Sequence, residues 1–128
     1  MKRFLVLTLI LVLCLTLVSC KDSGKMIYEN ITAEDAKEIM DTETDYIILD
    51  VREQDEYDVG HIPGAILIPY TEIENQAALK LPDKDTLLLI YCRSGRRSKI
   101  AAEALVELGY SNIKEFGGII DWPYEIEK

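Results

Sequence analysis

Short apolar runs recur along most of the chain and alternate with polar, helix-compatible stretches. Two of these runs, residues 46–51 and 86–91, are continuous and of strand length, which is typical of parallel strands that are buried on both faces. Residues 86–91 form the most apolar run and are predicted to be the central strand. Three shorter runs complete the set of predicted strands, at residues 27–31, 65–68 and 113–116.

The polar stretches between these runs predict helices, and their ends carry recognisable signals. Thr32 with Asp35, and Thr71 with Glu74, fit the capping box, in which two side chains satisfy free backbone N–H groups at the start of a helix. Gly109 fits the glycine that commonly follows the last residue of a helix. The predicted helices cover residues 33–41, 53–59, 71–81 and 98–108, with a short terminal helix after Gly117 and Gly118.

This alternation predicts an α/β fold: a single domain with a twisted parallel sheet of about five strands and helices on both faces. The last long helix is expected to bury an apolar stripe made of Ile100, Ala101, Ala104, Leu105 and Leu108. Folds of this kind bind ligands at the carboxyl ends of their strands. The residues directly after the central strand are therefore the first candidates for chemistry.

The first twenty residues differ in character from the rest of the chain. A positive start, Met1 to Arg3, precedes an uncharged run over residues 4–18. This run is shorter than the roughly 20 residues of a membrane-spanning helix, so a secretion signal is the better interpretation. It ends in the sequence LVSC at residues 17–20, which resembles the lipobox of bacterial lipoproteins. The alternative is an ordinary signal peptide with a cysteine near its cleavage site.

The lipobox resemblance implies a lipoprotein signal peptide over residues 1–19 and a lipidated Cys20 as the first mature residue. Residues 20–25 then form the lipidated cysteine and a polar tether, and the folded domain covers residues 26–128. We therefore expect an exported bacterial lipoprotein, anchored at the extracytoplasmic side of a membrane. That side is either the periplasmic face or the cell surface.

The charge balance narrows the range of partners. The chain has 14 Lys and Arg residues against 23 Asp and Glu residues. Loss of Lys2 and Arg3 with the signal leaves 12 against 23, a net charge of −11. Such acidity disfavours nucleic acid and the surface of an anionic membrane. We expect no nucleic-acid partner, and membrane attachment through the lipid on Cys20 only.

The cysteines point to one reactive thiol. The chain has three, Cys14, Cys20 and Cys92. Cys14 leaves with the signal and Cys20 is modified, so the mature domain keeps one thiol and cannot form an internal disulfide. A free thiol in an oxidising compartment is a liability, which favours a functional role for Cys92.

Cys92 directly follows the predicted central strand and precedes a segment of small and basic residues, 93–97, which has three arginines in five positions. Such a loop can turn its backbone N–H groups inward as an anion-binding nest, and the start of the following helix adds further N–H groups and a positive dipole end. A thiol held there ionises more easily than free cysteine. The sequence therefore predicts a thiolate in a site for small anions.

Residues 92–98, with the sequence CRSGRRS, resemble the active-site loop of rhodanese-like sulfurtransferases. Residues 50–53 (DVRE) and 60–65 (GHIPGA) are similar to the N-terminal signature of that family. Residues 117–119 (GGI) with Trp122 are similar to its C-terminal signature. The motifs follow one another in the family's order, and the resemblance implies a single rhodanese-like domain.

The resemblance also implies a two-step reaction. The thiolate of Cys92 takes a sulfur atom from thiosulfate, or from a persulfide or polysulfide donor, and the resulting persulfide passes it to cyanide or to a thiol acceptor, including an acceptor protein. Cys92 is then the nucleophile, Arg97 is a candidate for binding substrate, and no cofactor is expected. The loop forms the expected site for small anionic sulfur compounds: Arg93, Ser94, Gly95, Arg96, Arg97 and Ser98.

Two other functions share parts of this pattern. Related phosphatases and arsenate reductases have a longer loop, with arginine six positions after the cysteine, whereas here Ser98 occupies that position and Arg97 the one before it. The second alternative is a persulfide carrier or redox-responsive module that binds a partner and turns over poorly. The shorter loop favours the sulfurtransferase over the phosphatase or arsenate reductase, and a retained thiol in a full basic loop favours the enzyme over the carrier.

The remaining candidates are assigned supporting or structural roles. His61 is the only histidine, and it resembles part of a structural turn in the family. One histidine and one free cysteine do not make a metal-ligand set, so no metal is expected. Asp50 is predicted to support the site through hydrogen bonds that hold Arg52 or the loop. Arg52 is predicted to pair with Glu53 or Glu56 at the surface, with contact to the substrate as the alternative.

Overall fold

The computed structural model describes residues 27–128, and within them five parallel strands form one sheet in the order β1-β5-β4-β2-β3. The α/β fold with a five-stranded parallel sheet is therefore confirmed. The predicted signal peptide, Cys20 and the tether lie outside the described residues. The strands are β1 (Glu29–Asn30), β2 (Tyr46–Asp50), β3 (Ile66–Leu67), β4 (Leu87–Cys92) and β5 (Ile113–Gly118).

Strand β4 is the centre of the sheet, as predicted, and all six of its residues are buried. It pairs with β2 on one side and with β5 on the other. Asp50 lies opposite Tyr91 in the β2 pair, and Cys92 lies opposite Gly118 in the β5 pair after a shift of register. The carboxyl ends of the three longest strands therefore meet around Cys92.

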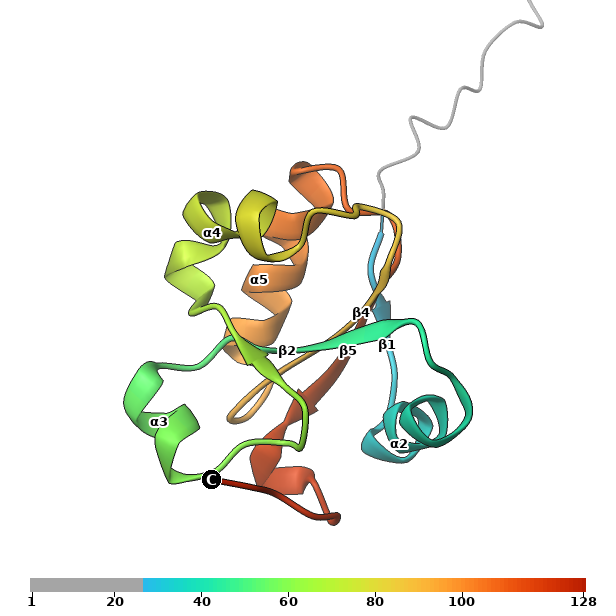
Figure 1. The fold of residues 1–128 in the computed structure, drawn as a ribbon, viewed down its shortest axis with the longest axis vertical. Helices are drawn as coiled ribbons and strands as arrows, with labels where there is room; N and C mark the ends of the chain where they lie inside the picture. The colour runs from blue at the N-terminus through green and yellow to red at the C-terminus, as the bar shows by residue number, and fades with distance from the viewer. Residues whose placement is uncertain (1–26) are drawn as a thin grey trace, which may run out of the picture.

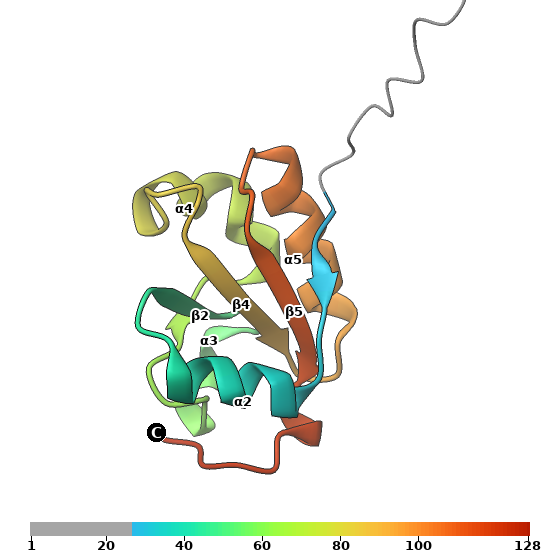
Figure 2. The ribbon, with the colours of Figure 1, turned by 90° about the vertical axis from the view of Figure 1, so that its right-hand side faces the viewer.

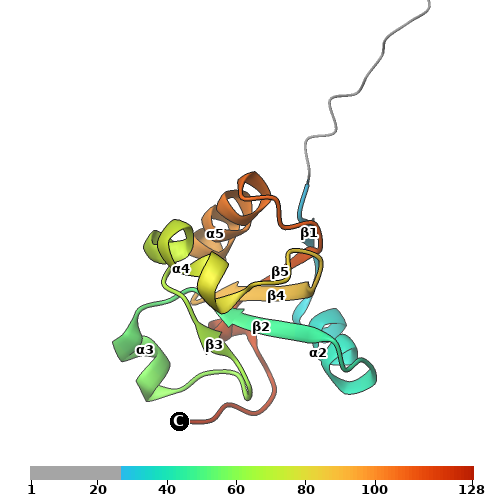
Figure 3. The ribbon, with the colours of Figure 1, turned by 45° about the horizontal axis from the view of Figure 1, so that its top comes forward.

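Helices cover both faces of the sheet, as Figure 1 and Figure 3 show with α4 and α5 above it and α2 below. Figure 3 also places α3 beside the β3 edge, and Figure 2 shows α2 crossing close to the carboxyl ends of β4 and β5. No helix within residues 27–128 combines the length and the apolar character needed to cross a membrane. The helices are α2 (Ala33–Thr42), α3 (Gln54–Val59), α4 (Ile73–Lys80) and α5 (Arg96–Glu107), with short 3-10 helices η2 (Tyr70–Glu72) and η3 (Ile119–Asp121).

Alternate residues of β4 build two separate cores, because side chains of a strand point to opposite faces in turn. Leu88, Ile90 and Cys92 join the core under α4 and α5. Leu89 and Tyr91 join the core on the α2 side, with Phe116 and Trp122. Cys92 thus faces α5, the helix that starts just after it.

The predicted helix starts were partly wrong. The Thr32 capping box is present, but Thr71 forms none, because it lies inside the 3-10 helix η2 instead of in the extended conformation of a cap. Helix α5 starts at Arg96, two residues earlier than predicted, after Gly95 turns the chain with a φ of 111°. Its buried face is also rotated, so that Ile100 is 40% exposed. The fully buried residues of α5 are Ser98, Ala101, Ala102 and Leu105.

Candidate active site

Cys92 is the last residue of β4, and its loop turns immediately into α5. Two glycines make this turn possible. Gly95 adopts a left-handed conformation, which side chains with a Cβ rarely accept. A Cβ at Gly118 would overlap the backbone carbonyl of Arg93, because the loop passes directly over the end of β5. The backbone conformation at Gly95 and the close packing at Gly118 therefore determine the position of the Cys92 thiol.

The sulfur of Cys92 is buried, with the residue 1% exposed, and it lies among polar groups of its own loop and of β5. The N–H of Gly95 donates to Sγ at 3.0 Å, and Ser98 Oγ lies 3.4 Å from Sγ. Burial by itself raises the pKa of the Cys92 thiol, but the hydrogen bond with the Ser98 side chain and those with the backbone N–H groups of Ser98, Gly95 and Ser94 outweigh it and lower the pKa. The site therefore favours a thiolate.

Ser98 connects this sulfur to a buried carboxylate that the sequence reasoning missed. Its Oγ donates to Glu115 Oε1 at 2.6 Å, with the Gly95 carbonyl at 2.9 Å as a second acceptor. The same Glu115 oxygen accepts the N–H of Gly117 at 2.8 Å. Glu115 is 2% exposed and lies within β5, which the sequence predicted only as a short strand. A charged residue inside a strand of the sheet is the sequence signal that could have identified Glu115 as a candidate site residue.

The three arginines of the loop occupy different environments. Arg97 donates to both oxygens of Glu56 on α3, at 2.6 and 2.8 Å. The hydrogen bonds from Arg97 hold the pKa of Glu56 down to about 2, against the effect of burial. Arg96 lies over the ring of Tyr70 at 5.9 Å, and Arg93 is exposed. Arg97, the predicted substrate-binding residue, is therefore already paired with a carboxylate.

A cavity of about 390 Å³ opens over this loop and has a mostly polar lining. A larger cavity, of about 770 Å³, lies on the α2 side of the sheet next to Trp122. The small cavity adjoins the loop of Cys92, so it is the candidate for a substrate site in spite of its size. It is lined by Glu53, Tyr70, Arg93, Ser94, Arg96 and Arg97.

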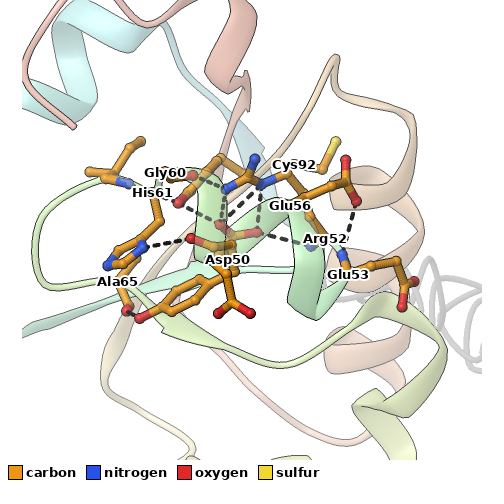
Figure 4. A network of polar contacts seen from close by, with 12 residues as sticks. Asp50, Arg52, Glu53, Glu56, Gly60, His61, Ala65 and Cys92 are labelled. Atoms are coloured by element: carbon orange, nitrogen blue, oxygen red, sulfur yellow. Dashed lines mark hydrogen bonds and ion pairs between the residues drawn. The ribbon is translucent and has the colours of Figure 1, made fainter. Parts of the chain in front are cut away.

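Asp50 and Arg52 lie next to the site in a buried network, which Figure 4 shows. Arg52 donates to both oxygens of Asp50 and to the carbonyl of Gly60 at 2.7 Å. Its predicted pairing with Glu53 or Glu56 is therefore wrong, because burial brings it to the nearest buried carboxylate. Asp50 also accepts the hydroxyl of Tyr91 at 2.7 Å. Burial and the charge of Asp50 raise the pKa of Tyr91.

His61 belongs to the turn that follows α3. Its ring stacks on Tyr57 at 3.8 Å, and its Nδ1 lies 2.9 Å from the Tyr57 carbonyl. Its backbone pairs with Glu127, which ties the C-terminal segment to the turn. Among residues 27–128, no three His, Cys, Asp or Glu side chains come together in a way that would hold a metal ion.

A thiolate in a cradle of N–H groups at the carboxyl edge of a parallel sheet defines a class of α/β proteins with a cysteine nucleophile for small anions. Within that class, residues 32–123 match the rhodanese-like domain, which is more than half of the chain. The chain belongs to the rhodanese-like domain family.

The relatives of the chain include enzymes. The thiosulfate sulfurtransferase PspE of Escherichia coli is 40% identical over 73 residues, which are 57% of this chain and 70% of PspE. The thiosulfate:glutathione sulfurtransferase of Saccharomyces cerevisiae is 34% identical, over 70% of this chain and 73% of its own. A solved structure described as rhodanese with anions from E. coli superposes with a TM-score of 0.61 at 36% identity, covering 65% of this chain and 98% of that one. These similarities support a sulfurtransferase activity in general.

Proposed function

We propose that the protein is a sulfurtransferase that carries sulfur as a persulfide on Cys92. It takes the sulfur from thiosulfate, or from a persulfide or polysulfide donor, and gives it to cyanide or to a thiol acceptor. The observation that carries this proposal is the set of donors around Sγ, which lowers the pKa of the thiol in a buried site. The names of two relatives, both thiosulfate sulfurtransferases, support thiosulfate as the donor.

The reaction proceeds by two displacements at sulfur. The Cys92 thiolate attacks the outer sulfur of thiosulfate, a new S–S bond forms, and the old S–S bond breaks so that sulfite leaves with its electron pair. The acceptor then attacks the outer sulfur of the persulfide, and the Cys92 thiolate leaves. The thiolate and the persulfide are both anionic, and the fixed N–H groups of the loop stabilise this charge without reorganising.

The cavity above the loop suits an anionic donor. Arg93 and Arg96 line it and make no ion pair among the described residues. Their charges are therefore available to bind the sulfonate end of thiosulfate. Arg97 contributes a charge that Glu56 partly neutralises, so its main role is to fix the geometry between α3 and α5.

Export and anchoring form a separate part of the proposal. The sequence of residues 17–20 supports cleavage before Cys20 and a lipid on that residue, which would hold the domain of residues 26–128 at the extracytoplasmic side of a membrane. Membrane partition of the full chain tests this. A Cys20→Ser form should move to the soluble fraction, and partition equal to wild type would contradict lipidation.

Intact mass of the mature domain tests the activity directly. After incubation with thiosulfate, we expect a gain of one sulfur atom that cyanide removes as thiocyanate. The same treatment of Cys92→Ala should give no gain. Absence of a gain with thiosulfate and with polysulfide, in protein whose thiol still alkylates, would contradict the proposal.

A further inference from the structure

The cavity over the Cys92 loop has one acid in its lining, Glu53, beside three arginines. Glu53 is the N-cap residue of α3, and its side chain is exposed. None of the ion pairs among residues 27–128 includes it. In Figure 4 its carboxylate points away from the buried pair of Asp50 and Arg52. The negative charge of Glu53 is therefore available to a ligand in the cavity.

The sulfur donor gives no reason for a carboxylate in this place. Thiosulfate carries two negative charges, so an acid in its binding cavity weakens the attraction of the arginines instead of adding to it. The acid is close enough to matter, because the hydrogen bond with Glu56 raises the pKa of Arg97 and the charge of Glu53 adds a smaller contribution. A role for Glu53 must therefore be sought in the second reactant, the acceptor.

Donor and acceptor use the cavity in turn, because both react at the sulfur of Cys92. Once sulfite has left, Arg93 and Arg96, which make no ion pair among the described residues, can bind a second anion. The acceptor thus meets two available cations and one available anion. A small thiol that carries both a carboxylate and an ammonium group matches this set of charges.

We propose that Glu53 selects the acceptor by binding the ammonium group of a thiol that is also an amino acid, while Arg93 and Arg96 bind its carboxylate. The acceptor reacts as its thiolate, having given its proton to water. It attacks the outer sulfur of the Cys92 persulfide, a new S–S bond forms, and the bond to Cys92 breaks so that its sulfur leaves with the electron pair. The inference rests on the proposed function and adds the chemical class of the acceptor.

The test compares the amino acid cysteine with mercaptopropionate, which is cysteine without its amino group. In a two-step transfer, kcat/KM for each substrate reports the step in which that substrate reacts. We expect Glu53→Gln to lower kcat/KM for cysteine about five- to tenfold and not to lower it for mercaptopropionate or thiosulfate. The ratio of variant to wild type cancels the intrinsic nucleophilicity of each thiol.

Asp55→Asn is the matched control for charge. Asp55 is an exposed residue of α3 that lies two positions from Glu53 and does not line the cavity. Both substitutions remove one negative charge and keep an oxygen that can accept a hydrogen bond at the start of α3. Asp55→Asn should therefore change kcat/KM little, and to a similar extent for the two thiols.

Equal changes for cysteine and mercaptopropionate in Glu53→Gln would overturn the proposal, and so would an equal discrimination in Asp55→Asn. In either case Glu53 would act only through the general field of its charge. A fully retained rate with cysteine would overturn it as well.

The gain of one sulfur from thiosulfate alone, read by intact mass, tests the proposed function separately because it needs no thiol acceptor. If that gain is absent, the rates at which the Cys92 thiolate exchanges with the disulfides of the same two thiols still measure selection by Glu53. We expect Glu53→Gln to slow exchange with cystine and not with the disulfide of mercaptopropionate. Equal rates of exchange relative to wild type would overturn the inference, so either idea can fail alone.

Discussion

Glu56 and Arg97 are 41 positions apart in the chain, yet their side chains meet through two hydrogen bonds of 2.6 and 2.8 Å. The pair joins α3 to α5 beside the cavity of the Cys92 loop. It is partly exposed, and bidentate geometry makes it stronger than an ordinary surface ion pair.

We expect Glu56→Gln to lower the free energy of unfolding at neutral pH by about 1 to 2 kcal/mol, which is below the full value of the pKa shift because water screens the pair. The pKa of Glu56 is lowered from 4.5 to about 2 by its hydrogen bonds with Arg97. Its carboxylate therefore contributes stability above pH 4.5, and this contribution is lost as the pH falls towards 2. Urea unfolding across this range measures it.

Glu107→Gln serves as the control for this experiment, because Glu107 is exposed and forms no ion pair among the described residues. It should keep the pH dependence of wild type. In Glu56→Gln the difference from wild type should shrink as the pH falls below 4.5. A difference that stays constant down to about pH 2 would mean that the ion pair contributes no stability.

Much of the fold could be predicted from the sequence, because strands that are buried on both faces are continuous apolar runs. The continuous apolar run of β4 and the small, basic loop after it identified the central strand and the position of Cys92. The ends of the helices were harder to predict. Thr71 has the right residue type for a cap, but the N–H of Tyr70 bonds to Val51 and pulls the segment into a 3-10 turn.

The side-chain partners within the site could not be predicted in the same way. The Glu56–Arg97 and Ser98–Glu115 contacts join separate elements, and no local pattern specifies which acid meets which partner. Arg52 shows the same limit, since adjacent acids suggested a surface pair and the folded chain buries it against Asp50. Residue types thus indicated the chemistry, while the topology decided the contacts.

We expect Gly118→Ala to disrupt the Cys92 loop. A Cβ at this position would overlap the carbonyl of Arg93, so the loop must move, at a cost of about 3 kcal/mol or more. Gly117→Ala is the matched control. Gly117 has a φ of 90° but open space around it, so the cost there is backbone strain alone, about 1 kcal/mol. Urea unfolding and the alkylation rate of Cys92 measure both variants.

The two glycine variants separate space from backbone conformation. Gly118→Ala should lose both stability and thiol reactivity, whereas Gly117→Ala should lose mainly stability. Equal costs in the two variants would show that the close approach of the loop to β5 is not what requires glycine at position 118.

Arg96 should contribute to donor binding more than to the chemical step. Its guanidinium lines the cavity and lies over Tyr70, which positions it for an anion entering from solvent. We expect Arg96→Ala to raise the KM for thiosulfate about five- to tenfold, with a smaller change in kcat, as loss of about 1 kcal/mol of binding predicts. Thiocyanate formation at varied thiosulfate concentration measures both constants.

Lys99→Ala is the control for charge alone, because Lys99 is an exposed residue of α5 that does not line the cavity. Its effect on KM should be small and should vanish at high salt. Equal effects of Arg96→Ala and Lys99→Ala would reduce the role of Arg96 to general electrostatic attraction.

The buried network of Asp50, Arg52 and Tyr91 should stabilise the fold and leave the thiol reactive. In Tyr91→Phe, Asp50 loses a donor and the buried N–H of Ile62 loses its acceptor, which lay at 3.0 Å. We expect a loss of about 1 to 3 kcal/mol in the free energy of unfolding. Asp50→Asn leaves Arg52 buried without its counter-charge and should lose more, about 3 to 5 kcal/mol.

Tyr46→Phe is the matched control, since it removes a tyrosine hydroxyl that makes one part-buried hydrogen bond to the carbonyl of Met40. Its cost should be at the low end, about 0.5 to 1 kcal/mol. Urea unfolding ranks the three variants, and the alkylation rate of Cys92 in the folded proteins should stay close to that of wild type. If Tyr91→Phe loses no more free energy of unfolding than Tyr46→Phe, water replaces the lost partner. Slower alkylation of Cys92 would show that the network also shapes the loop.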